Sequence, residues 1–190
     1  MNKCSDYVPF DLALKTGSTL LTGGIAENSP RVIGFYIVFS INVGLRAGDV
    51  LNLRHKDLQG KNAKDKLIII ERKTGKKRKI YLNTNVIRAY ELLVQDHIFD
   101  PEEFIFMSRK GHYTLRSMNR ILKDCFVMPE LNISTHSLRK CFGRHLFESY
   151  DESDKGLIIL NEMFHHNCVA TTRVYLGLRE EELSEAYKNL

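Results

Sequence analysis

The sequence lacks a long apolar run, and its first thirty residues contain no apolar segment of the kind found in a secretory signal peptide. These absences argue against a membrane-spanning or secreted chain, and we predict a cytoplasmic protein with no membrane partner. Apolar residues make up 43% and charged residues 27% of the 190 residues, which is typical of a globular chain that buries a core. The length fits one domain of ordinary size.

Cysteine is scarce, and the motifs of several enzyme classes are missing. The four cysteines lie far apart and form no CxxC pair, so we expect neither a disulfide framework nor a zinc knuckle: Cys4, Cys125, Cys141 and Cys168. There is no H-E-x-x-H, no G-x-S-x-G and no carboxylate cluster for two-metal chemistry. The run from Lys73 to Lys77 lacks the upstream glycine and the following Ser/Thr of a P-loop. We therefore expect no metal ion and no cofactor.

Positive charge is present in excess and is concentrated in one stretch. The net charge is +5, but residues 61–79 alone hold nine Lys or Arg against two acids, Asp65 and Glu71. Such a run can contact several phosphates and gain affinity from counterion release. It can equally be a solvated hairpin edge, where lysines discourage aggregation. Composition does not choose between these interpretations.

Periodicity predicts a mainly α (α+β) fold with one small antiparallel β-sheet. Alternating runs at 66–72 and 77–82 flank Thr74-Gly75, which favours a hairpin. Pro30 is placed to open a helix that ends near Gly44. Helices are expected over residues 31–43, 46–53, 83–97, 115–126, 136–149, 155–164, 170–176 and 181–189.

Two short segments combine basic side chains with helix starts. Arg46 follows a helix-ending glycine, where its guanidinium could enter a cleft or pair with Asp49 on the surface. His136 and Arg139 are three residues apart and share one helix face, an arrangement that suits a phosphoryl group. Each segment alone is also typical of an ordinary exposed helix.

A third segment runs from His165 and His166 to Tyr175. Neighbouring histidines on a helix point about 100° apart, so one of the two is expected to enter a given site. A single tyrosine near basic residues is most often a core residue whose hydroxyl is hydrogen-bonded. The segment gains meaning only together with the other two.

Together the segments resemble the tyrosine recombinase, or phage integrase, family. That family has a GLR-x-x-[DE] box, a lysine in a β-hairpin, an H-x-x-R box, a histidine or tryptophan, and a tyrosine nine residues later. The matching residues occur here in the same order: Arg46, Lys73, His136, Arg139, His166 and Tyr175. The resemblance spans residues 29–175. It departs from the pattern at His165, where the family usually has glycine, and Lys76 and Lys77 crowd the turn that holds Lys73.

The resemblance implies a helical catalytic domain over residues 29–178 and a C-terminal helix over 179–190. Residues 1–28 would be an N-terminal segment or a linker to a missing DNA-binding domain, in a fragment of a mobile-element integrase. The implied activity is site-specific DNA recombination through a covalent 3′-phosphotyrosine. The implied partners are double-stranded DNA, a homotetramer on paired sites formed from free monomers, and accessory DNA-bending proteins.

The resemblance also implies a role for each matching residue. Arg46 and Arg139 would hold the non-bridging phosphate oxygens, with a further hydrogen bond from His166. Tyr175 would attack phosphorus. His136 would accept the tyrosine proton, and Lys73 would protonate the departing 5′ oxygen. Contacts to the DNA backbone are expected from a group in the hairpin: Lys76, Lys77, Arg78 and Lys79.

The same residues are compatible with other functions. The chain could be a DNA invertase of the fimbrial phase-switch type, or a non-catalytic DNA-binding relative that retains the residues without the activity. A type IB topoisomerase shares the chemistry but needs no paired sites. A plain helical interaction domain would bind no DNA, or would bind it without sensitivity to salt.

Overall fold

The structure is a computed structural model that describes residues 5–23, 30–108 and 111–189. Its helices are α1 (Phe10–Thr22), α2 (Pro30–Val43), α3 (Ala47–Leu51), α4 (His55–Leu58), α5 (Thr84–Val94), α6 (Leu115–Cys125), α7 (Thr135–Ser149), α8 (Asp154–Phe164), α9 (Val169–Leu176) and α10 (Leu178–Lys188). Its strands are β1 (Lys66–Ile70), β2 (Lys77–Tyr81), β3 (Met107–Ser108) and β4 (Gly111–His112). The predicted fold class, mainly helical with a small antiparallel sheet, is confirmed.

The predicted hairpin is the pair β1 and β2. The strands run antiparallel with Leu67 opposite Ile80 and Ile68 opposite Lys79. Leu67 and Ile80 are buried, whereas Ile68 and Lys79 face outward, as the twofold alternation of a strand requires. The hairpin therefore packs one face on the core and presents lysines on the other.

Helix α2 is the centre of the larger core. Its side chains are apolar on every side, and a helix of that kind is stable only when other elements surround it. Phe35, Tyr36 and Phe39 are fully buried, and α2 packs against α1, α5 and α7. The ring of Phe35 stacks on Phe106, which anchors the segment between α5 and α6.

Helix α1 was not predicted, since the first predicted helix begins at residue 31. The structure folds residues 10–22 against α2 through two glycines. A Cβ atom added at Gly34 would lie 2.5 Å from the carbonyl oxygen of Gly17, so the two backbones touch there. The boundary near residue 29 stays a prediction, and Cys4 lies outside the described residues. Helix α4 was also not predicted.

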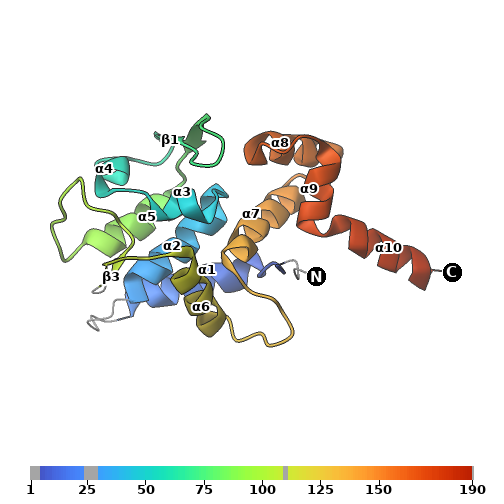
Figure 1. The fold of residues 1–190 in the computed structure, drawn as a ribbon, viewed down its shortest axis with the longest axis horizontal. Coiled ribbons are helices and arrows are strands. Elements are labelled where there is room, and N and C mark those ends of the chain that lie inside the picture. The colour runs from blue at the N-terminus through green and yellow to red at the C-terminus, as the bar shows by residue number, and fades with distance from the viewer. Residues whose placement is uncertain (1–4, 24–29, 109–110, 190) are drawn as a thin grey trace.

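The buried apolar side chains form two clusters, and α7 contributes to both. The larger cluster contains α1 to α6 and the first half of α7, including Leu138 and Cys141. The smaller one joins Phe142 and Phe147 of α7 to α8, α9 and the start of α10. Figure 1 shows this division, with α8, α9 and α10 on one side of α7 and the remaining helices on the other.

Helix α10 extends away from the body of the molecule (Figure 1). Its first residue, Leu178, is buried, but Leu183 and Tyr187 are 53% and 78% exposed. Leu190, the third member of the predicted apolar stripe, lies outside the described residues. In the part of the chain that the structure covers, no helix is long and apolar enough to cross a membrane.

Candidate functional site

One cavity of about 670 Å³ lies where the two clusters meet. Six separate segments line it: the start of α3, the β1–β2 loop, the start of α6, the start of α7, the turn after α8, and α9. All six residues predicted to be catalytic are on its wall: Arg46, Lys73, His136, Arg139, His166 and Tyr175. The structure thus brings together side chains that are up to 129 positions apart in the sequence (175 − 46).

Arg46 is placed by the glycine that ends α2. Gly44 has φ +59°, a left-handed conformation that glycine adopts without strain, and the Phe142 ring packs directly over it. Arg46 then caps α3 with extended backbone angles. Its Nη1 donates to Oε2 of Glu71 at 2.7 Å, and its Nη2 reaches the Phe164 carbonyl oxygen at 3.5 Å. Arg46 therefore pairs with Glu71, and not with Asp49, which was one of the two expectations from the sequence.

Arg139 is buried on α7, with 5% of the residue exposed. Its guanidinium lies 4.4 Å above the Phe164 ring, and Nη2 donates to the Phe164 carbonyl at 3.3 Å. Arg46 and Arg139 therefore share one carbonyl, at the C-terminal end of α8. Burial lowers the pKa of Arg139 to about 10, with smaller contributions that include the neighbouring charge of Arg46. The side chain stays charged at neutral pH.

Arg139 also keeps part of its donor capacity unused. Its buried Nη1 has no hydrogen-bond partner among the described residues. An unsatisfied buried donor on a charged group is costly unless an anion meets it. Arg139 lines the same cavity as Arg46, and two guanidinium groups in one cavity suit a phosphate or a similar anion.

The first turn of α7 holds His136 at the cavity. Ser134 caps the helix, and its hydroxyl accepts a hydrogen bond from the backbone N–H of His136 at 3.1 Å. The backbone N–H of Thr135 donates to Oδ1 of Asn119 on α6 at 2.8 Å. His136 is exposed, and its pKa is lowered by partial burial and then by the charges of Arg139 and Lys140. A neutral imidazole at neutral pH can accept a proton.

His166 lies between Tyr175 and a short hydrogen-bond chain. Its Nδ1 is 2.9 Å from the hydroxyl oxygen of Thr172, and that hydroxyl donates to Oδ1 of Asn161 at 3.2 Å. The hydroxyl hydrogen is thus in use, so Thr172 accepts from Nδ1–H and leaves Nε2 of the neutral ring as an acceptor. Burial, followed by the charges of Arg139 and Arg46, lowers the pKa of His166.

The aromatic side chains place Tyr175 beside the arginines. Its ring meets the rings of His166 and Phe164 edge to face, with centroid distances of 5.4 and 5.5 Å. Nζ of Lys140 lies 5.6 Å from the centre of the Tyr175 ring. His165 also lines the cavity, but it is exposed and has φ +54° as the C-cap of α8. Of the two histidines, His166 makes the contact with Tyr175.

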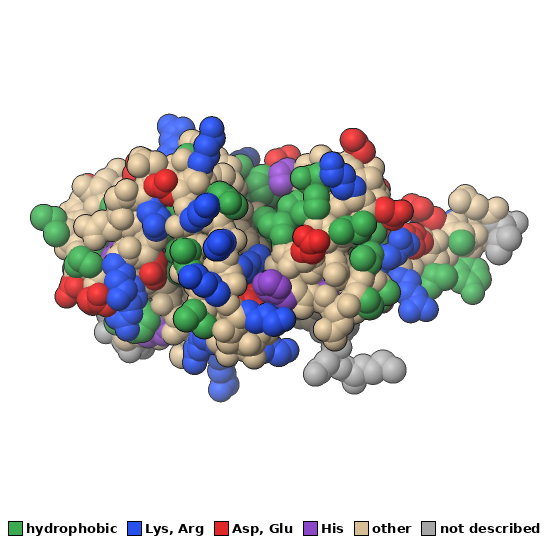
Figure 2. All heavy atoms as spheres, turned by 90° about the horizontal axis from the view of Figure 1, so that it is seen from above, with side chains coloured by type: hydrophobic (Ala, Val, Ile, Leu, Met, Phe, Trp, Pro, Cys, Tyr) green, Lys and Arg blue, Asp and Glu red, His purple; other side chains and the backbone are tan. Residues whose placement is uncertain are grey.

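The basic residues of the hairpin divide into two groups. Lys76, Lys77 and Lys79 are exposed, and Figure 2 shows Lys and Arg side chains gathered on the side of the molecule that carries the hairpin. Arg78 is different, because it is only 6% exposed and its Nη1 lies 3.4 Å from Oε1 of Glu71. Burial and the ion pair with Glu71 set Arg78 apart from the three exposed lysines, and its contact with DNA stays a prediction. Lys73 is exposed in the loop at the cavity rim.

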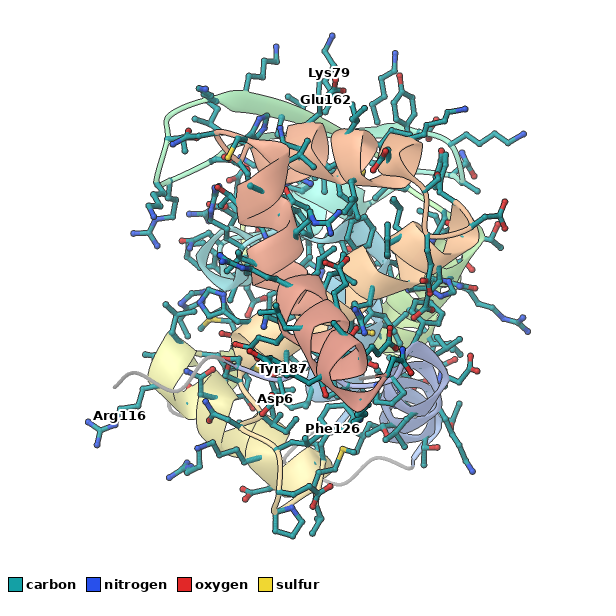
Figure 3. The ribbon with its side chains drawn as sticks, turned by 90° about the vertical axis from the view of Figure 1, so that its right-hand side faces the viewer. Asp6, Lys79, Arg116, Phe126, Glu162 and Tyr187 are labelled. Atoms are coloured by element: carbon teal, nitrogen blue, oxygen red, sulfur yellow. The ribbon has the colours of Figure 1, made fainter. Side chains whose placement is uncertain are left out.

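A second cavity separates the hairpin from α8. It has a volume of about 580 Å³, and Lys79 of β2 and Glu162 of α8 are among its lining residues. In Figure 3 both side chains lie at the top of the molecule. None of the six predicted catalytic residues lines this second cavity.

Three residues that were not selected from the sequence belong to the site. Glu71 binds Arg46, Phe164 binds both arginines, and the ammonium group of Lys140 lies near Tyr175. Glu71 had been counted only as an acid within a basic run. Strand alternation places it on the buried face with Leu67 and Ile69, which was a usable signal.

The lining of the cavity is suited to the chemistry of anions. No group of three or more His, Cys, Asp or Glu side chains that could hold a metal ion is found in the described ranges. The cavity lining includes three guanidinium groups, an ammonium group, three imidazoles and a phenol. Such a set can bind a phosphodiester, stabilise added charge on it, supply a nucleophile and move protons.

Comparison with known proteins gives a consistent result. The profile of the phage integrase family matches residues 27–182. The probable integrase/recombinase YoeC of Bacillus subtilis is 32% identical over 157 residues, covering 81% of this chain and 82% of YoeC. The chain spans about half the length of the XerD and XerC recombinases of Oceanobacillus iheyensis that it also matches.

Solved structures share the fold. The crystal structure of the XerA recombinase has a TM-score of 0.68 at 18% identity, covering all of this chain and 66% of XerA. The XerH site-specific recombinase, solved bound to its difH substrate before cleavage, has a TM-score of 0.66 at 18% identity, covering 98% of this chain and 54% of XerH.

Proposed function

This chain belongs to the phage integrase family, and from that premise we propose that it is a site-specific DNA recombinase that cleaves and rejoins strands through a covalent 3′-phosphotyrosine. One observation carries the proposal. Two buried or half-buried guanidinium groups, those of Arg46 and Arg139, converge on one carbonyl beside Tyr175 in a single cavity.

Cleavage begins when a phosphodiester occupies the cavity. Arg46 and Arg139 donate to the non-bridging oxygens, where negative charge increases as phosphorus becomes five-coordinate. The Tyr175 oxygen forms a bond to phosphorus while its proton passes to His136, and the bond to the 5′ oxygen breaks. Lys73 gives a proton to that leaving oxygen. The phosphotyrosine keeps the energy of the diester, so rejoining needs no ATP.

His166 donates to the phosphate only after it gains a proton. Its Nδ1–H is directed to Thr172, so Nε2 becomes a donor when the ring is protonated. An anionic phosphate in the cavity raises the histidine pKa, opposing the effect of burial and of the arginine charges. DNA binding is therefore expected to be coupled to the uptake of a proton by His166.

Double-stranded DNA is the proposed partner, bound as a homotetramer on paired sites. The exposed lysines of the hairpin suit phosphate contacts, and the XerH structures contain DNA. The exposed apolar side chains Leu183 and Tyr187 of α10 suit contact with a neighbouring protomer. The proposed role is integration and excision of a mobile element in the cytoplasm, on nucleoid DNA, with accessory DNA-bending proteins.

Two alternatives predict different outcomes on DNA. An invertase of the fimbrial phase-switch type recombines inverted sites within one molecule, whereas an integrase joins sites on separate molecules. A non-catalytic relative binds DNA in a salt-sensitive way but forms no covalent complex. A topoisomerase relaxes supercoils without paired sites.

The nucleophile can be tested with nicked duplexes drawn from the DNA that flanks the gene. The nick lets the 5′ product diffuse away, so a covalent protein–DNA band accumulates on a denaturing gel. We expect this band in the presence of EDTA for the wild type and for Tyr150→Phe, a matched loss of a hydroxyl at the end of α7. Tyr175→Phe should give no band. A band that persists in Tyr175→Phe refutes the assigned nucleophile.

A further inference from the structure

We propose that Glu71 is a positioning residue that holds the Arg46 guanidinium in its cleavage-competent orientation. The inference rests on the proposed function, because it assigns the reason for which Arg46 can meet a phosphate. Glu71 itself faces the arginine and not the phosphate, and it touches none of the reacting atoms.

The side chain of Glu71 is fully buried and is held by three donors. Oε2 accepts from Nη1 of Arg46 at 2.7 Å and from the hydroxyl of Thr74 at 2.8 Å. Oε1 lies 3.4 Å from Nη1 of Arg78. Both carboxylate oxygens are therefore used, and each contact approaches from a different element or loop position.

The backbone of Glu71 closes the turn that carries Lys73. Its N–H donates to the carbonyl of Lys76 at 3.0 Å, and its carbonyl accepts from the N–H of Gly75 at 2.8 Å. The next residue, Arg72, donates its N–H to Oδ1 of Asp49 in α3 at 2.9 Å. The loop is thus tied to Arg46 and to α3 through two adjacent residues, Glu71 and Arg72.

The carboxylate is ionised at neutral pH. Burial alone would raise the pKa of Glu71, but the hydrogen bonds from Thr74 and Arg46 and the charges of Arg46 and Arg78 bring it below its ordinary value. A buried charge that loses its partner destabilises a protein strongly. Glu71 and Arg78 therefore depend on each other, whereas Arg46 keeps one side open, with 24% of its side chain exposed.

Electrostatics alone would make Glu71 a disadvantage to the site. A carboxylate in contact with a guanidinium weakens the attraction of that guanidinium for a phosphate. Its value is geometric: it occupies Nη1 and fixes one rotamer of a long side chain, so less freedom is lost when a phosphate binds. If the electrostatic effect dominates, removing the charge of Glu71 should speed cleavage. If the geometric effect dominates, removing it should slow cleavage.

Glu71→Gln alone leaves Arg78 buried without a counter-charge and can impair folding. The test therefore uses a double variant and a matched control variant. In the double variant Glu71→Gln/Arg78→Gln both buried charges are removed and the net charge stays the same. A matched control is Arg31→Gln/Asp96→Asn, which removes an ion pair between α2 and the end of α5, away from the cavity.

Single-turnover cleavage is measured with saturating nicked duplex, at a temperature where thermal unfolding shows each variant folded. Misplacement of a catalytic group by about 1 Å can cost on the order of 100-fold. We expect cleavage by the Glu71/Arg78 double variant to slow by about 10- to 100-fold, with DNA affinity changed less than about threefold. The control variant should cleave at the wild-type rate. Cleavage by the double variant at or above that rate overturns the proposal.

A second measurement does not depend on activity. The Nε–H signal of Arg46 in nitrogen-15 spectra of the free protein reports whether the guanidinium is ordered. We expect slow solvent exchange in the wild type and fast exchange in the Glu71/Arg78 double variant. An equally ordered Arg46 in both proteins overturns the proposal. If the wild type forms no covalent complex, the proposed function fails, and this signal still decides the role of Glu71.

Discussion

Replacing Gly44 with alanine tests how the junction before Arg46 is built. Gly44 has φ +59°, and an added Cβ would lie 2.2 Å from Cδ1 of Phe142. Two penalties combine. A left-handed alanine costs about 1–2 kcal/mol, and overpacking against a buried ring costs about 1–3 kcal/mol. We therefore expect Gly44→Ala to lower the free energy of unfolding by about 2–5 kcal/mol.

Substitutions at two other glycines allow the conformational cost to be measured apart from the packing cost. Gly60 has φ +71° with no atom within 4 Å of an added Cβ, so Gly60→Ala should show only the conformational cost of about 1–2 kcal/mol. Gly48 lies in α3 with ordinary φ and open space, so Gly48→Ala should be neutral or stabilising by about 0.5–1 kcal/mol.

The assay is urea and thermal unfolding followed by circular dichroism. For a chain of this length, a change of 1 kcal/mol corresponds to roughly 2–4 °C in Tm, so Gly44→Ala should lower Tm by about 4–20 °C. A loss for Gly44→Ala no greater than that for Gly60→Ala would refute the tight packing of Phe142. Cleavage should fall together with stability, because Gly44 sets the direction of the chain into Arg46.

Three further predictions concern other parts of the molecule. His165→Gly should stabilise the fold by about 0.5–1 kcal/mol in urea unfolding by removing left-handed strain, whereas His165→Ala should not; equal effects would contradict this. Burial is the main cause that lowers the pKa of three histidines in the folded protein. As the pH falls, the unfolded chain therefore binds protons at a higher pH than the folded protein does, and Tm should fall from pH 7 to pH 5. A rising Tm would contradict this prediction. Those histidines are His55, His136 and His166. Substituting Lys76, Lys77 or Lys79 with glutamine should lower the slope of log affinity against log salt by about 0.9 for each phosphate that is no longer neutralised, and an unchanged slope for all three would remove the hairpin from the DNA interface.

Local patterns were sufficient to predict much of the fold. The hairpin follows from strand alternation, and α5 and α7 begin at the residues where Asn83 and Ser134 cap them. Helix α1 was missed because its Gly17 is a poor helix former in isolation. The role of Gly17 is apparent only in the tertiary structure, where it lets the backbone of α2 approach closely at Gly34.

The candidate site was predicted as a set of residues but not as a network. Order along the chain was enough to select Arg46, Arg139 and Tyr175, whereas the shared carbonyl of Phe164 requires the tertiary structure. The burial of Arg78 was not predicted, because the basic run was interpreted by charge alone. The alternation that buries Ile80 places Arg78, two residues earlier, on the same buried face.

The division of the core into two clusters bears on the timing of the reaction. Among the described residues the cluster that supports Tyr175 has seven buried apolar side chains, whereas the cluster that supports Arg46 has thirty-one. A unit with so few buried side chains opens locally at a lower free energy than the rest of the protein. In such an opening Tyr175, the proposed nucleophile, leaves its place while the Arg46 side of the cavity stays folded. Under the proposed function, strand breakage then waits for the smaller unit to close again, so that holding DNA and cutting it become separate events in time.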